Sequence, residues 1–424
     1  MSSPAQSAVI RKISYRLLPF LFLLYIVNYL DRVNVSFAAL QMKSALQFSD
    51  SVFGFGAGIF FVGYLLFQIP SNLLLKRIGA RRWLAVLIIL WGAISSCTMF
   101  VRTPFSFYTF RFLLGLAEGG FFPGVIFYLT FWFPRSVRAR TVSRFMIAMP
   151  LSGVIGSPLS GAILVLHGAH GLAGWQWLFL LEGAPAVLLG FILPFVLTDR
   201  PEHAAWLSNE DRATLSTLLE GEGNRSALAN QVSFTQIIFR PETWLLCGAY
   251  FTLIYGSLGT GIWLPLVIKD FSGLNNLQVA ILTAVPYLVA AISMWFVARL
   301  SDKSRKPHAT FACSVFAAAV ALALSTQTHQ VVLSIALLSI ALAGIYSAFG
   351  PFWAMPGDFF SGQAAAAGIA FINSLGNLGG FFGPYISGAA KQHTSSFTAG
   401  TLILAAVLLS GGLLARRALH FSRM

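Results

Sequence analysis

The chain has 424 residues, of which 57% are hydrophobic and only 10% are charged. A soluble domain carries about 25% charged residues, so composition excludes a soluble enzyme although the chain is long enough for one. The net charge of +14 would suit nucleic acid, but no soluble segment interleaves a basic stripe with aromatic residues, which argues against a nucleic-acid partner.

Twelve apolar stretches follow in chain order, each near the length of about 20 residues that a membrane-spanning helix needs. The first six lie near 17–40, 52–75, 83–101, 104–132, 141–166 and 175–197. The second six lie near 243–268, 277–299, 308–326, 330–355, 363–390 and 394–415. The first stretch has a basic start like a signal peptide, but it is too long and lacks a cleavage site. The prediction is an all-α membrane protein of twelve transmembrane helices in two six-helix bundles.

One long polar stretch, 199–242, separates an N-terminal bundle (1–198) from a C-terminal bundle (243–424). It holds seven of the fourteen acidic residues and reads as a linker with some amphipathic helix, too short for a catalytic domain. The two halves also look related, since a constant offset of 226 pairs Tyr29 with Tyr255 and Pro158 with Pro384. A repeat of six and six spans is typical of transporters with a central binding site.

Basic residues are distributed unequally between the two sets of loops. Twenty-two of the 28 Lys and Arg residues fall in the termini and in alternate loops, while the other loops hold four: Lys43, Arg102, Lys269 and Lys391. Cytoplasmic loops carry this excess in membrane proteins. We therefore expect a multi-pass protein of the cell inner membrane, surrounded by membrane lipid, with both termini and the linker in the cytoplasm.

Four charged residues fall inside predicted spans: Asp31, Arg32, Arg111 and Glu118. Each costs about 2.5 kcal/mol or more at a helix centre, so such residues are commonly functional. Arg111 and Glu118 are two helical turns apart on one face, about 10 Å along the axis. That spacing is too long for a direct pair and leaves room for a ligand or for a partner from the first span.

The two arginines offer forked donors that suit a carboxylate, and the two acids are candidate proton carriers. A buried carboxylate is driven toward its neutral form by desolvation and toward its ionised form by a nearby arginine. A substrate that occupies the arginine shifts this balance and so couples binding to protonation. The alternative is that the four residues only hold helices together as buried ion pairs, and Asp31 is placed to hold its neighbour Arg32 in part.

Uncharged polar residues within the spans are candidates for lining the same cavity. They are Tyr29, Tyr64, Gln68, Tyr255, Asn373 and Asn377. Each alone is also explained by a hydrogen bond between helices. Glu182, in the outer part of the sixth span, reads as a structural residue. The three cysteines lie in apolar runs without metal-ligand spacing and indicate neither a metal site nor a disulfide.

Several motifs carry a family resemblance across nearly the whole chain. They are YLDRVNVS at 29–36, PSN…RIGARR at 70–82, RFLLGLAEGG at 111–120, GWQWLFLLEG at 174–183 and AFINSLGNLGG at 370–380. Together they resemble the anion:cation symporter family of the major facilitator superfamily, which includes bacterial carriers of tartrate, phthalate, glucarate, galactonate and hexuronates. The resemblance implies the major facilitator fold. It also implies substrate contacts at Arg32, Arg111, Tyr29, Tyr64 and Asn373, and proton coupling at Asp31 and Glu118.

The chain departs from the resemblance at two places. Lys76 replaces the usual Asp in the basic loop after the second span, although Asp302 keeps it after the eighth. The surroundings of Met149 are apolar where sugar-acid carriers place a polar side chain. The second departure weighs against a heavily hydroxylated substrate and leaves aromatic or short dicarboxylates open.

The expected function is secondary active import of a small organic anion with protons: a sugar acid, a dicarboxylate or an aromatic carboxylate. The alternative is an organic-anion exchanger of the same fold, favoured by Gly153, Gly156, Pro158 and Gly161 in the fifth span. No paired-histidine metal site, nucleophile elbow or phosphate loop favours an enzyme. We expect no cofactor, no metal and a monomer.

Overall fold

The structure is a computed structural model that describes residues 4–134, 137, 141, 145–227, 238–328, 330–359 and 362–421. The first bundle comprises α1 (Pro4–Ala45), α2 (Asp50–Ile78), α3 (Ala80–Cys97), α4 (Pro104–Gly119), α5 (Phe121–Leu129), α7 (Ala148–Leu164) and α8 (Gly174–Val196). The second comprises α11 (Pro241–Ser272), α12 (Asn276–Ser304), α13 (Pro307–Ser325), α14 (Val331–Ala354), α15 (Gly362–Asn377), α16 (Gly379–Thr394) and α17 (Phe397–Phe421). Short 3₁₀ turns cover Thr98–Phe100, Ala169–Gly171, Pro201–His203 and Met355–Asp358.

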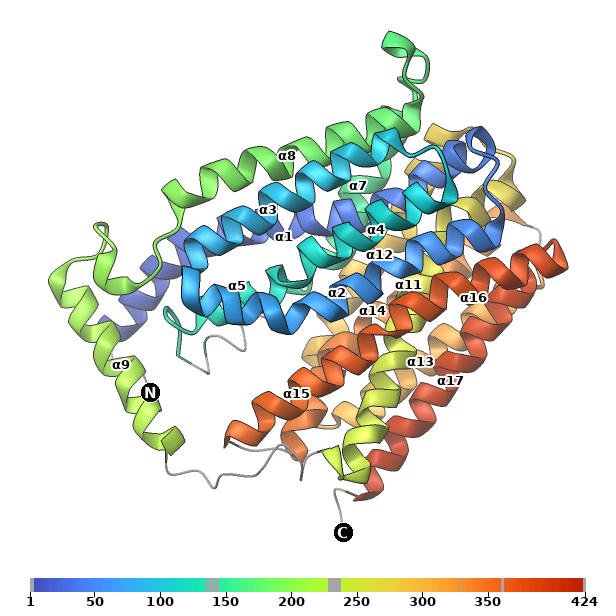
Figure 1. The fold of residues 1–424 in the computed structure, drawn as a ribbon. Helices are drawn as coiled ribbons and strands as arrows, with labels where there is room; N and C mark the ends of the chain where they lie inside the picture. Colours follow the sequence, from blue (N-terminus) through green and yellow to red (C-terminus); the bar gives the residue numbers. More distant parts are fainter. Residues whose placement is uncertain are drawn as a thin grey trace.

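These helices confirm the predicted all-α fold of twelve spans in two six-helix bundles, seen side by side in Figure 1. In the described part of the chain, ten helices are long and apolar enough to cross a membrane. The fifth span is α7, with 17 residues, and the first residues of its predicted range fall partly outside the described residues. The fourth and eleventh spans are each made of two consecutive helices, α4 with α5 and α15 with α16, which meet at Gly120 and Leu378.

The glycine-rich fourth span allows close packing on α2. A Cβ at Gly115 would meet the carbonyl of Phe60, and one at Gly119 would meet the carbonyl of Tyr64. Because glycine has no Cβ, the two backbones lie nearer than ordinary side chains permit. This contact brings the α4 residues Arg111 and Glu118 close to the aromatic face of α2.

Helix α9 (Asn209–Ala227) lies in the linker and is polar rather than clearly amphipathic, and residues 228–237 of the linker lie outside the described part. The Lys12 Nζ donates to Asp211 Oδ2 at 2.7 Å, which ties α9 to the beginning of α1. This ammonium group holds the pKa of Asp211 below its usual value. We call the side of the protein that carries both termini and α9 the terminal side (Figure 1).

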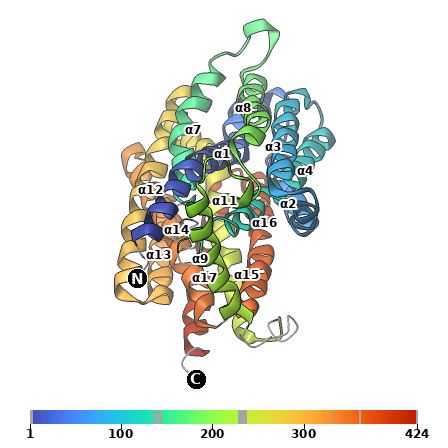
Figure 2. The ribbon, with the colours of Figure 1, turned by 90° about the vertical axis from the view of Figure 1, so that its left-hand side faces the viewer.

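The two bundles contact each other mainly through the halves that lie away from the terminal side. Helix α2 packs on α16 there, with Gly54 against the Pro384 carbonyl and Gly58 against Phe381. Figure 2 shows α7 of the first bundle beside α12 of the second, where Gly153 contacts the ring of Tyr287. On the terminal side α15 scarcely contacts α2, and the two bundles diverge in Figure 1.

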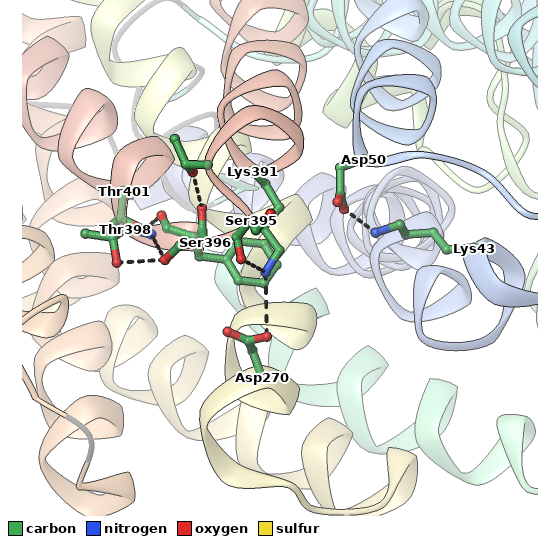
Figure 3. A network of polar contacts seen from close by, with 10 residues as sticks. Lys43, Asp50, Asp270, Lys391, Ser395, Ser396, Thr398 and Thr401 are labelled. Atoms are coloured by element: carbon green, nitrogen blue, oxygen red, sulfur yellow. Dashed lines mark hydrogen bonds and ion pairs between the residues drawn. The ribbon is translucent and has the colours of Figure 1, made fainter.

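Polar contacts gather on the side opposite the termini, with one ion pair inside each bundle. Figure 3 shows the ion pair between Lys43 and Asp50 and the one between Lys391 and Asp270, whose Nζ and Oδ1 are 3.6 Å apart. The Ser51 amide also donates to Gln392 Oε1 of the other bundle at 3.0 Å. The structure is therefore one in which the bundles are joined on the opposite side and separated on the terminal side.

Candidate functional site

A buried ion pair joins α1 to α4 at the middle of the first bundle. Arg32 donates to Glu118 Oε2 from Nη2 at 3.0 Å and from Nε at 3.3 Å. The same oxygen accepts from Asn28 Nδ2 at 2.9 Å, one turn earlier on α1. Glu118 Oε1 is buried without a partner. The spacing of Arg111 and Glu118 left room for a partner from the first span. That partner is Arg32, which pairs with Glu118.

Arg111 is buried, with 1% of its surface exposed, yet none of its three side-chain nitrogens has a hydrogen-bond partner. Its guanidinium carbon lies 5.0 Å from the centre of the Phe60 ring. A buried charge of this kind is costly unless it is paired. A reading of the four charged residues as purely structural ion pairs does not explain these unpaired nitrogens.

Asp31 does not hold Arg32, contrary to the expectation for neighbouring residues. Its Oδ1 accepts instead from Ser95 Oγ of α3 at 2.7 Å and from Asn34 Nδ2 at 3.4 Å. Consecutive residues on a helix point about 100° apart, so Asp31 faces α3 while Arg32 faces α4. Asp31 Oδ2 is buried without a partner.

Aromatic rings surround the Arg32 guanidinium. Its carbon lies 5.3 Å from the ring centre of Tyr29, 5.1 Å from that of Tyr64 and 5.4 Å from that of Phe60. Ring faces attract cations at such distances. Two of the tyrosines chosen from the sequence thus lie at the arginines, and Phe60, which contacts both arginines, was not singled out.

The second bundle contributes tyrosines that the sequence analysis did not select. Tyr250 and Tyr346 lie near Tyr29, and Tyr287 packs edge-on against Tyr346 with ring centres 6.1 Å apart. All three are buried. A tyrosine in an apolar span is indistinguishable from a core residue by sequence, and only the packing of the bundles brings these rings to the first bundle's charged centre.

Three selected residues of the second bundle lie apart from this group. The Tyr255 ring packs on Phe251, and its hydroxyl is buried without a partner. Asn377 Nδ2 donates to the Asn373 carbonyl at 2.8 Å, within their own helix. Gln68 reaches the same region, since its Oε1 accepts from Ser374 Oγ at 3.4 Å. The structure does not bring Tyr255, Asn373 or Asn377 into contact with the arginines.

Comparison with known proteins identifies what this arrangement resembles. The model of the Major Facilitator Superfamily matches residues 21–384. A putative tartrate transporter of Agrobacterium vitis is 48% identical over 417 residues, covering 96% of this chain and 94% of that protein. A quinolone resistance transporter of Acinetobacter baumannii is 38% identical, covering 95% of this chain and 93% of that protein.

A solved structure shares the fold. It is a bacterial homologue of the human lysosomal transporter Spinster, in an inward-facing, unoccupied conformation, with a TM-score of 0.74 and 18% identity. The alignment covers 100% of this chain and 97% of that one. At this identity the likeness concerns the fold alone.

Proposed function

The chain belongs to the major facilitator superfamily and is a multi-pass membrane transporter rather than an enzyme, and we propose that it imports a small organic anion together with protons. The observation that carries this proposal is the buried Arg111 guanidinium, whose nitrogens have no partner in the structure. A carboxylate fits a guanidinium through two parallel hydrogen bonds. The likeness to a putative tartrate transporter supports an organic anion as the substrate.

The ion pair beside Arg111 provides a route to coupling. Arg32 now binds Glu118 at 3.0 Å. A substrate carboxylate that engages Arg32 as well as Arg111 competes for the same donors and leaves Glu118 without its cation. A carboxyl group in a low-dielectric site without a cation favours its neutral form, so substrate binding and proton binding at Glu118 reinforce each other. Asp31, with one unpartnered oxygen, is the second proton-carrying acid.

The remainder of the substrate faces neutral groups. Tyr29 and Tyr64 lie at Arg32, and Tyr250 and Tyr346 approach from the second bundle. Aromatic walls with few polar groups are typical of small-molecule sites. We keep Tyr255, Asn373 and Asn377 as proposed contacts for the distal part of the substrate, in a conformation in which the bundles close on the terminal side.

We further propose that the terminal side is the cytoplasm and that the membrane is the cell inner membrane. The support is the split of 22 basic residues against four between the two sets of loops. The linker 199–242 between the bundles 1–198 and 243–424 is then cytoplasmic.

Cysteine labelling tests this orientation. Cys97 and Cys313 are exposed and Cys247 is buried, so all three are first replaced. Thr217→Cys, on the exposed face of α9, is expected to react with a membrane-impermeant maleimide only after the cells are broken. Labelling of this cysteine in intact cells would show that the terminal side faces outward. The matched control is Gln47→Cys, exposed on the opposite side, which should react in intact and in broken cells.

Uptake into proteoliposomes tests the transport proposal. Purified protein is reconstituted and supplied with labelled tartrate, with and without an inward proton gradient. The expected result is accumulation above equilibrium only with the gradient, abolished by a protonophore. Equal uptake with and without the gradient, for tartrate and for a panel of aromatic and sugar carboxylates, would contradict proton symport.

An exchanger of organic anions is the second candidate. Helix α7 carries Gly153, Gly156, Pro158 and Gly161, and Gly153 and Gly161 pack on Tyr287 and Ala280 of α12. Exchange predicts that unlabelled anion inside the liposomes drives labelled uptake without any pH gradient, and that empty liposomes take up none.

A further inference from the structure

Glu182 is a buried acid that the proposed transport steps do not use. It lies on α8, eight residues after the helix begins at Gly174, and has 4% of its surface exposed. At 1.5 Å per residue this is about 12 Å into the helix from the opposite side. An acid at such a depth is costly and is commonly functional.

The carboxyl group of Glu182 is only half satisfied. Its Oε1 accepts from Ser160 Oγ of α7 at 2.7 Å, while its Oε2 is buried without a hydrogen-bond partner. The amide of Asn34 on α1 is its other polar neighbour. A residue that served only to join α7 to α8 would not need this second oxygen, and glutamine would supply the same contact without a titratable group.

Asn34 connects Glu182 to a proton-carrying acid of the proposed transport cycle. It is buried, with 1% of its surface exposed, and its Nδ2 donates to Asp31 Oδ1 at 3.4 Å while its Oδ1 has no partner. The same side chain is the polar neighbour of Glu182, toward which its amide nitrogen is the donor. Glu182, Asn34 and Asp31 thus form a line of buried polar groups from the opposite side toward the arginines.

The groups that surround Glu182 are acidic or neutral. The elements packed on α8 are α1, α3, α7 and the uncharged 3₁₀ turn Thr98–Phe100. Asp31 is the titratable residue on α1 that lies toward Glu182, α3 places Ser96 beside Gly183, and α7 supplies Ser160. None of these neighbours is a cation, in contrast to Glu118, which is paired with Arg32.

We propose that Glu182 is the outer proton-binding residue of this transporter and that it delivers its proton to Asp31. The proposal rests on the proton symport proposed above. The O–H bond breaks at Glu182 Oε2 and forms at Asp31 Oδ2, the unpartnered oxygen of each group, so Glu182 becomes the carboxylate and Asp31 the acid. Because Asn34 stands between the two groups, a water molecule admitted when the opposite side opens carries the proton across.

The test measures uptake as a function of external pH in proteoliposomes of uniform orientation. Glu182→Gln keeps size and hydrogen bonding but cannot carry a proton. We expect it to lose proton-driven accumulation while counterflow of labelled substrate continues near the wild-type rate. Glu182→Asp keeps an acid and should retain accumulation with a shifted external-pH profile. Ser160→Ala removes the contact to α7 but leaves the acid, and it should also still accumulate substrate.

The outcomes separate this inference from the function on which it rests. If wild-type protein shows no response to a proton gradient, proton symport itself fails. If the wild type responds and Glu182→Gln accumulates substrate with an unchanged external-pH profile, Glu182 is structural and the inference is overturned. A loss of counterflow in Glu182→Gln, Glu182→Asp and Ser160→Ala alike would also assign Glu182 to helix packing alone.

Discussion

The two bundles have the same number of spans but opposite interiors. The first bundle buries Asp31, Arg111, Glu118 and Glu182, with Arg32 among them nearly enclosed. In the described part of the second bundle no Lys, Arg, Asp or Glu is buried, and tyrosines and hydroxyl residues provide its polar interior. Since a buried ion costs free energy in proportion to how poorly it is paired, the cost of ionic chemistry is concentrated in one half.

This difference indicates a division of labour. The charged bundle holds the groups that recognise an anion and exchange protons, and their mutual distances are set within one bundle by α1, α3, α4 and α8. The neutral bundle can move against it without separating any ion pair in the core. Rocking of the bundles about a central site, as is common in transporters with this repeat, then changes the wall that faces the substrate but not the charges that hold it.

Substitution of the proton-carrying acids of the first bundle should have the largest effect on transport. Glu118→Gln and Asp31→Asn replace an acid with an amide that cannot release a proton. Uphill uptake driven by pH is expected to be abolished in both, while counterflow persists because it needs only reorientation of the loaded carrier. Glu202→Gln, at an exposed acid in the linker, is the matched control. If both amide variants still accumulate substrate when driven by pH, Asp31 and Glu118 are structural residues.

Substitution of Arg111, whose guanidinium is unpaired, should have the next largest effect, on substrate affinity. Arg111→Lys keeps the charge but loses the fork, so substrate affinity should fall by roughly ten- to a hundredfold, the range for a lost hydrogen bond to a charged group. Stabilisation of the purified protein against heat by a saturating carboxylate measures it. Arg102→Lys, at an exposed arginine on the opposite side, should behave like wild type. Near-native affinity in Arg111→Lys would make this residue a general electrostatic attractor.

Substitution of Arg32 should lower substrate affinity less than substitution of Arg111. Glu118 already occupies the donors of Arg32 at 3.0 and 3.3 Å, so Arg32→Lys should reduce affinity less than Arg111→Lys, by roughly tenfold or less. Its larger effect should be on the pH dependence of uptake, because a lysine holds Glu118 through one point contact instead of two donors. An affinity loss greater than that of Arg111→Lys would place the main carboxylate contact at Arg32.

The neutral bundle should show the smallest effect. Tyr346→Phe removes one buried hydroxyl near Tyr29 and should change affinity by about fivefold at most, the equivalent of one neutral hydrogen bond. The ratio of substrate accumulated to proton gradient applied should not change. Tyr15→Phe, at a residue that is 78% exposed, controls for the substitution. Loss of coupling in Tyr346→Phe would show that the second bundle takes part in proton transfer.

Most of the fold follows from local features of the chain. Apolar runs of about 20 residues predict the spans because lipid leaves the helix as the simplest way to satisfy every backbone group. The weakest prediction fell where a helix is divided: the eleventh span is two helices that meet at Leu378. Glycine-rich segments signalled close helix packing, but not that the helix is divided there.

The sequence by itself determined which side chains bear the chemistry, because an Asp, Glu or Arg in an apolar run is exceptional whatever its neighbours. Only the tertiary structure decided their partners. Arg32 pairs with Glu118 rather than with adjacent Asp31, Arg111 is left without a partner, and Glu182 lies beside Asn34. The reason is geometric, since successive helical residues point about 100° apart, and the group that each one meets depends on which helix packs against that face.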